Sequence, residues 1–168
     1  VVCNRLGLVI EEAWTDADIG EICGRYVSQG EPVFGCLWTQ LDASMYAVLI
    51  RCRRSVEAGL VRYVAVIDCR GEKRHRRFFS RWHEIAHMLM LPPSMESPVH
   101  RSGDGRSAVE RLMDMIAADI GFFAPVFAPV LAAEVRSGGG LSFAGVERVR
   151  RGYCPRASYE ATLHACID

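Results

Sequence analysis

The 168-residue chain has one lysine among its 20 basic residues, no C-x-x-C pair, and no apolar run long enough to cross a membrane as a helix. The missing C-x-x-C pattern excludes zinc ribbons and thioredoxin-like redox sites. Its seven cysteines are an odd number and stand mostly in apolar or strand-like contexts, where a reduced thiol packs as a small hydrophobic group. No basic segment followed by an apolar stretch opens the chain, so no secretory signal is visible. We therefore expect a protein of the reducing cytoplasm that has no membrane partner.

Charge is balanced over the whole chain but not along it. Between Arg51 and Arg81 there are ten basic residues against Glu57, Asp68 and Glu72. One interpretation is a solvated face in a protein that favours arginine over lysine. The other is a patch that meets an acidic partner or a phosphate backbone.

The apolar periodicity and the turn-forming residues between the periodic segments predict an α+β protein. We expect a single domain over residues 1–168, which can be part of a longer chain. Thr15 is a candidate N-cap for a helix over 16–28, and Ser80 for a helix that Pro92-Pro93 ends. A second long helix is expected from Ser107, and short helical segments follow the glycine linker at 137–140. The three predicted strands, rich in β-branched and aromatic residues, are 33–40, 45–52 and 61–68. The expected fold is a small, about three-stranded sheet packed on helices.

The stretch RWHEIAHMLML, residues 81–91, carries the chemistry. His83 and His87 are four residues apart, so on a helix they share one face and can point at the same ion. Glu84 is rotated off that axis and can accept a proton from an attacking water without being a ligand. This is the H-E-x-x-H pattern of zinc peptidases.

A catalytic zinc takes three protein ligands, so one more is needed. Glu110 is the strongest candidate, with Asp114 one turn later to accept the ring N–H of a ligating histidine. The alternative for Glu110 is a capping box with Ser107, in which its carboxylate turns back to the start of its own helix. His100 is the rival third ligand, but the H-E-x-x-H-x-x-G-x-x-H pattern fails because Met90 stands where that pattern needs glycine.

The segments RRFFSRWHEIAHMLML and VERLMDMIAADIGFFAP resemble the ImmA/IrrE metallopeptidases. Phe79-Ser80 stands where that family usually has Phe-Thr before H-E-x-x-H, and Ala117-Ala118 followed by Pro125 matches its second block. The similarity extends over most of residues 33–167, with about 30 motif-grade positions. The departures are Trp82 in a usually small position, which is expected to narrow the cleft, Ile116 where an aromatic is commoner, and the pair Met88 and Met90.

The resemblance implies a compact zincin-like, gluzincin-type fold that binds zinc, or manganese in its place. It implies endopeptidase action with Glu84 as general base and His83, His87 and Glu110 as ligands. In that family the substrates are often helix-turn-helix repressors or antitoxins, in stress responses and other transcription regulation.

Two other hypotheses remain beside the peptidase. The chain can be a non-catalytic regulator that binds a transcription factor or nucleic acid through residues 51–81, or a structural domain whose histidines lie on a helix edge. For the peptidase, we expect an extended substrate to add to the exposed edge of the strand at 61–68. Besides the metal, a second group would stabilise the oxyanion that forms during hydrolysis. Four residues are candidates for this role: Tyr153, Tyr159, His100 and His164.

Overall fold

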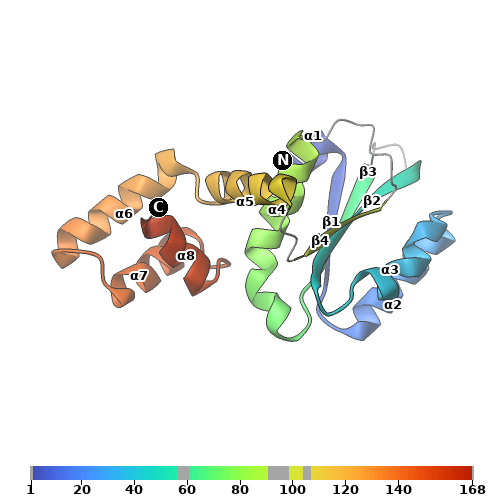
Figure 1. Cartoon of the computed structure of the whole chain (residues 1–168), viewed down its shortest axis with the longest axis horizontal. Coiled ribbons are helices and arrows are strands. Elements are labelled where there is room, and N and C mark those ends of the chain that lie inside the picture. Colours follow the sequence, from blue (N-terminus) through green and yellow to red (C-terminus); the bar gives the residue numbers. More distant parts are fainter. Residues whose placement is uncertain (1, 57–60, 91–98, 104–106, 168) are drawn as a thin grey trace.

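The computed structural model describes residues 2–56, 61–90, 99–103 and 107–167. Figure 1 shows a twisted sheet with helices on both faces and, beside it, a group of helices from the C-terminal part of the chain. The prediction of a mixed α and β protein is confirmed. No single helix among the described residues is long and apolar enough to span a membrane. Helices α5 (Ala108–Gly121) and α6 (Ala124–Gly138), bent by 65° at their junction, reach that length and apolarity only as a pair.

The sheet has four strands in the order β1-β3-β2-β4. Strand β1 (Leu8–Ala13) is parallel to β3 (Val61–Asp68), whereas β2 (Met45–Val56) is antiparallel both to β3 and to β4 (Val99–Gly103). The expectation that 61–68 is an edge strand is therefore wrong, because β1 and β2 flank it. The edge strands are β1 and β4.

The predicted strand at 33–40 is also wrong. Pro32–Cys36 forms a 3-10 helix (η1) and Leu37–Gln40 a short α-helix (α3). Pro32 occupies the start of η1, where its fixed φ suits a helix and its missing N–H costs nothing. Phe34 and Leu37, three residues apart, are then both fully buried on one side. The apolar residues of this segment, which are typical of a strand, are therefore buried in the core from a helical backbone.

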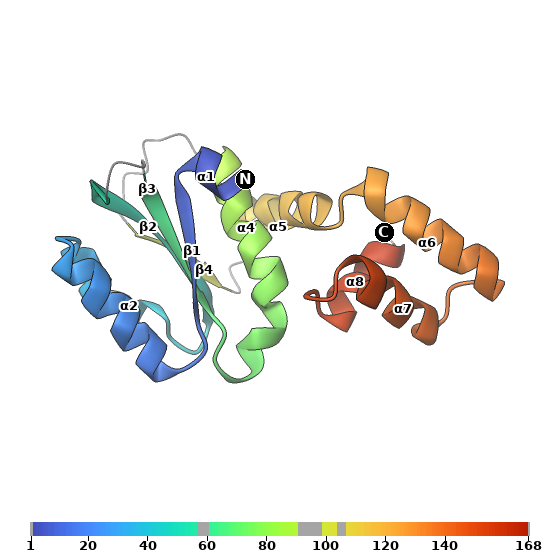
Figure 2. The same cartoon turned by 180° about the vertical axis from the view of Figure 1, so that it is seen from behind.

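Alternate residues of the central strands pack on opposite faces of the sheet, which explains their nearly continuous apolar sequence. Val48 and Val64 face the layer that holds α2 (Asp16–Ser28), η1 and α3. Leu49 and Ala65 face the layer that holds α1 (Val2–Leu6) and α4 (Arg77–Met90). Figure 2 shows the sheet between these two helical layers.

Helix α2 begins as predicted. The side chain of Thr15 accepts from the backbone N–H of Asp18, and the Asp18 carboxylate accepts from the backbone of Thr15 in return. Helix α4, however, begins at Arg77 directly after the 3-10 helix η2 (Gly71–Arg76), so Ser80 is a buried residue inside the helix rather than its N-cap. The predicted stop at Pro92-Pro93 lies outside the described residues.

The C-terminal part consists of α6 (Ala124–Gly138), α7 (Phe143–Tyr153) and α8 (Tyr159–Ile167). Its own core contains Phe127 and Val149. Phe78 of α4 packs against Phe122, and Phe122 packs against Phe127, so a row of aromatic rings joins this core to the sheet-containing part.

Candidate metal centre

Two helices supply the candidate site. Helix α4 lies with one face on the sheet, and α5 (Ala108–Gly121) packs closely beside it. The two helices approach each other closely near Gly121, where an added β-carbon would lie 2.9 Å from Cδ1 of Trp82. Trp82 therefore packs between the two helices and does not line the small pocket at the histidines; the expectation that it narrows the cleft is wrong.

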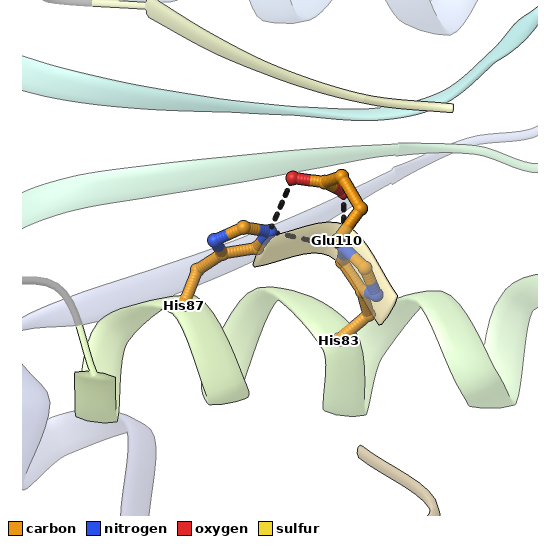
Figure 3. A group of neighbouring side chains, drawn as sticks. All are labelled: His83, His87 and Glu110. Atoms are coloured by element: carbon orange, nitrogen blue, oxygen red, sulfur yellow. Dashed lines mark hydrogen bonds and ion pairs between the residues drawn. The ribbon is translucent and has the colours of Figure 1, made fainter. Parts of the chain in front are cut away.

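Figure 3 shows His83 and His87 rising from α4 toward the carboxylate of Glu110, which comes from α5. Nε2 of His83 lies 3.0 Å from Nε2 of His87 and 3.1 Å from Oε2 of Glu110. Nε2 of His87 lies 3.4 Å from Oε1 of the same carboxylate. All three residues are buried, and their ligand atoms lie within 4.8 Å of one another.

These separations fit a tetrahedral metal site. A zinc ion with ligand atoms about 2.0–2.1 Å away holds neighbouring ligand atoms about 3.3–3.4 Å apart. The separations of 3.0 to 3.4 Å, of which the longest is to the second oxygen of the Glu110 carboxylate, are close to that spacing. Two histidines and one carboxylate are also a ligand set that zinc takes in catalytic sites. The buried group of His83, His87 and Glu110 could therefore hold a metal ion.

Asp114 orients the first of these ligands. Its Oδ1 lies 2.8 Å from Nδ1 of His83, so the ring donates from Nδ1 and turns the lone pair of Nε2 toward His87 and Glu110. Asp114 is one helical turn beyond Glu110, and its side chain is about half exposed. A carboxylate in this position fixes the tautomer of a ligating histidine and strengthens it as a ligand.

Acidic groups surround the His83 ring. Burial by itself would lower the pKa of this imidazole. The hydrogen bond to Asp114 and the charges of Glu84, Asp114 and Glu110 outweigh burial, and the pKa of His83 is raised above its usual value. Carboxylates gathered around converging nitrogen atoms suit a bound divalent cation for the same reason.

The alternative interpretation of Glu110 was a capping box. Ser107 is the N-cap of α5, and its Oγ accepts from the backbone N–H of Glu110. The Glu110 carboxylate, however, reaches His83 and His87 on the neighbouring helix. The cap thus holds the backbone of Glu110 in place while the side chain crosses to α4.

Glu84 lies on the same helix and is completely buried. With His83 and Asp114 it lines a small pocket of about 20 Å³. A space of that size admits about one water molecule. Glu84 is therefore placed, together with His83, at a space where a single water fits.

Two further residues line this pocket that the sequence did not assign to the metal centre. Tyr46 comes from β2 and Arg76 from η2, and the Arg76 guanidinium lies 4.1 Å from the centre of the Tyr46 ring. No local pattern places either residue at this site, because each reaches it only through the packing of η2 against the start of β2.

The remaining candidates whose side chains the structure describes lie elsewhere. His75 is on the surface beside Glu72. The ring of Tyr153 packs on Phe127, and the Tyr159 hydroxyl donates to the carbonyl of Phe143. His164 is exposed on α8, and of His100 the structure describes only the backbone, which pairs with Leu49.

Several basic residues of the 51–81 segment are paired with acidic groups. Arg70 and Lys73 both bind the buried carboxylate of Asp68, and Arg77 and Arg81 both bind Glu12. These contacts neutralise part of the charge that a phosphate backbone would otherwise meet.

Comparison of the chain with protein-family models, with curated proteins and with solved structures gives no significant match.

Proposed function

We propose that the protein is a metallo-endopeptidase with a zincin-like fold that hydrolyses peptide bonds at the His83, His87 and Glu110 centre. The observation that carries the proposal is the convergence of these three buried ligand groups from two helices, with buried Glu84 beside them. A metal-binding site that served structure alone would have no use for a buried carboxylate next to a space for one water. The ligand set suits zinc and also admits manganese.

Each residue of the centre has its own role in the proposed reaction. His83 and His87 would hold the ion through Nε2, and Glu110 would hold it through its carboxylate, while Asp114 keeps the His83 lone pair turned inward. The ion, when bound, acidifies a water and polarises the substrate carbonyl. Glu84 takes the proton from the attacking water and passes it to the departing amine. Burial in the small pocket keeps Glu84 near that one water and away from bulk solvent.

An extended substrate segment would add to a sheet edge. Of the two edges, β4 is favoured, because the chain continues from it into α5, which carries Glu110. This replaces the expected addition to 61–68.

We further propose, on the resemblance to the ImmA/IrrE metallopeptidases, that the substrate is a DNA-binding repressor or an antitoxin in the cytoplasm. Transcription regulation under stress is the setting that this resemblance favours. The pairing of Arg70, Lys73, Arg77 and Arg81 with carboxylates supports a protein substrate over direct binding of nucleic acid.

The test is cleavage of the unfolded protein β-casein by the zinc-loaded chain, followed by mass spectrometry. Glu84→Gln is expected to keep the zinc and to lower the cleavage rate by about 100- to 10,000-fold, the usual contribution of a general base. Glu72→Gln is the matched control, because Glu72 is almost fully exposed and away from the site. Undiminished cleavage by Glu84→Gln, or no cleavage by the zinc-loaded wild type, would contradict the proposed function.

A further inference from the structure

A large apolar groove opens beside the candidate metal centre. Its volume is about 1300 Å³, and it runs between the junction of α5 with α6 and the face of α8. Phe79 stands at one wall, and Phe123, Ala128 and Leu131 line it further along. The Phe123 side chain is exposed, as is that of Ala128. A soluble domain rarely leaves a contiguous apolar surface of this kind uncovered unless something binds there.

The groove adjoins the pocket beside His83. Arg76 and Phe79 line both spaces, and the pocket also contains His83 and Glu84. Phe79 precedes His83 by one helical turn, and its ring centre lies 6.4 Å from that of His83. A ligand bound at this end of the groove would therefore lie next to His83 and Glu84, to which we assign roles in hydrolysis.

The size and chemistry of the groove indicate a polypeptide occupant. Pockets for small molecules usually have volumes of about 300–1,000 Å³, and this groove is larger. Its polar rim contains Asp119 and Glu160 as well as Arg76 and His164. Mixed charges of this kind do not select a phosphate backbone or an anionic lipid surface. An apolar lining with a balanced rim fits a segment of bulky apolar side chains, as in grooves that bind amphipathic peptides.

We propose that this groove binds an apolar segment of the polypeptide substrate and sets the neighbouring peptide bond at the metal centre. The inference rests on the metallo-endopeptidase activity proposed above and adds a requirement on the substrate. The bond that is cleaved lies next to a cluster of bulky apolar residues in the substrate sequence.

Two exposed alanines on α6 provide a matched pair for the test. Ala128 lines the groove, whereas Ala133, five residues later on the same helix, does not. Ala128→Arg places a long charged side chain in the groove, and Ala133→Arg places the same side chain outside it. Since both positions are exposed, neither change disturbs the helical core.

The probe is a tryptic digest of β-casein passed over immobilised, zinc-loaded protein that carries Glu84→Gln, so that binding is read without cleavage. We expect retained peptides to be those with clustered bulky apolar side chains. Adding Ala128→Arg should lower their retention at least tenfold, and adding Ala133→Arg should leave it unchanged. Equal retention by the two arginine variants, or no selection for apolar peptides, would overturn the groove assignment.

The same variants separate this inference from the proposed function. If the wild type cleaves β-casein while Ala128→Arg retains and cleaves the apolar segments equally well, the groove assignment fails and the peptidase stands. If apolar peptides bind in the groove but the zinc-loaded wild type cleaves nothing, the peptidase fails and the groove remains a peptide-binding surface.

Discussion

The sheet-containing part of the molecule, through α5, and the helical part formed by α6 to α8 differ in what they bury. Among the described residues, eight polar or charged side chains are buried, and seven of them belong to the sheet-containing part: Glu31, Asp68, Ser80, His83, Glu84, His87 and Glu110. The helical part buries only Thr162 of this kind. Burial of a polar or charged group costs free energy unless the group is paired, so each of these seven residues needs a partner within the fold or at the candidate metal centre. In the proposed peptidase, the helical part would supply an apolar wall and the sheet-containing part would supply the reactive groups.

The largest expected effect tests a buried charge that serves the fold rather than the site. Asp68 is fully buried and binds both Arg70 and Lys73. Asp68→Asn would leave two cations poorly paired, and we expect it to lower the free energy of unfolding by about 3 kcal/mol in urea denaturation. Glu72→Gln, at an exposed carboxylate nearby, should change it by less than about 0.5 kcal/mol.

The effect of Asp68 should also depend on pH. Burial alone would raise the pKa of Asp68, but the hydrogen bonds from Arg70 and Lys73 lower it below the usual value. A carboxylate with a lowered pKa stabilises the folded state above its unfolded pKa, and this contribution is lost as the pH falls through the folded pKa. The difference between wild type and Asp68→Asn should therefore shrink below about pH 4. A constant difference from pH 7 to pH 2 would contradict the assignment.

The next effect tests a charge that serves the site. Asp114→Asn keeps an acceptor for Nδ1 of His83 but removes the negative charge. We expect zinc affinity, measured by competition with a chromogenic chelator, to fall by about 10- to 100-fold. Asp119→Asn, at an exposed position on the same helix, should leave zinc affinity within twofold of the wild type. Equal affinities for the two variants would remove Asp114 from the metal centre.

A smaller effect tests the contact that holds the two ligand-bearing helices together. In Gly121→Ala the new methyl group would press on the Trp82 ring, and α5 would have to shift from α4. We expect a loss of about 1–2 kcal/mol in stability together with weaker zinc binding. Gly24→Ala in α2, where an added β-carbon meets nothing within 4 Å, should instead stabilise the protein by about 0.5–1 kcal/mol. A neutral Gly121→Ala would show that the close packing does not set the position of Glu110.

The smallest effect is expected in the helical part. The Thr162 hydroxyl donates to the carbonyl of Ser158, which also accepts the backbone N–H of Thr162. Thr162→Val would therefore leave that carbonyl bonded, and we expect a change below about 1 kcal/mol in thermal unfolding, with zinc affinity unchanged. A loss of zinc in this variant would break the division between the two parts.

The two parts also differ in how well the sequence predicts them. The spacing of His83 and His87 is local, since one helical turn separates them, so the sequence predicts their common face directly. To bring Glu110 to the two histidines, the helix that carries it must pack beside the H-E-x-x-H helix. The sequence predicts this contact only indirectly, from the helix pattern around Glu110 and the motif that precedes it. The sequence predicts helices at 16–28 and from Ser107 because each begins with a capping side chain that acts within three residues.

What the sequence did not predict depends on contacts between distant residues. Strand β1 was missed because its Glu11 and Glu12 break the apolar run, although β3 and α2 cover the strand. The segment 33–40 has the composition of a strand but folds as helical turns, since Pro32 starts η1 and Phe34 and Leu37 share a buried side. Tyr46 and Arg76 reach the site only after the chain has folded.

The central claim is that two imidazoles and one carboxylate, brought together from α4 and α5, hold one divalent ion. Elemental analysis of the purified, zinc-equilibrated and dialysed protein tests it most directly, with His87→Ala compared with His75→Ala at a surface histidine. We predict one zinc ion per chain in the wild type and in His75→Ala, and less than about one tenth of that in folded His87→Ala. Full zinc content in His87→Ala, or none in the wild type, would contradict the account.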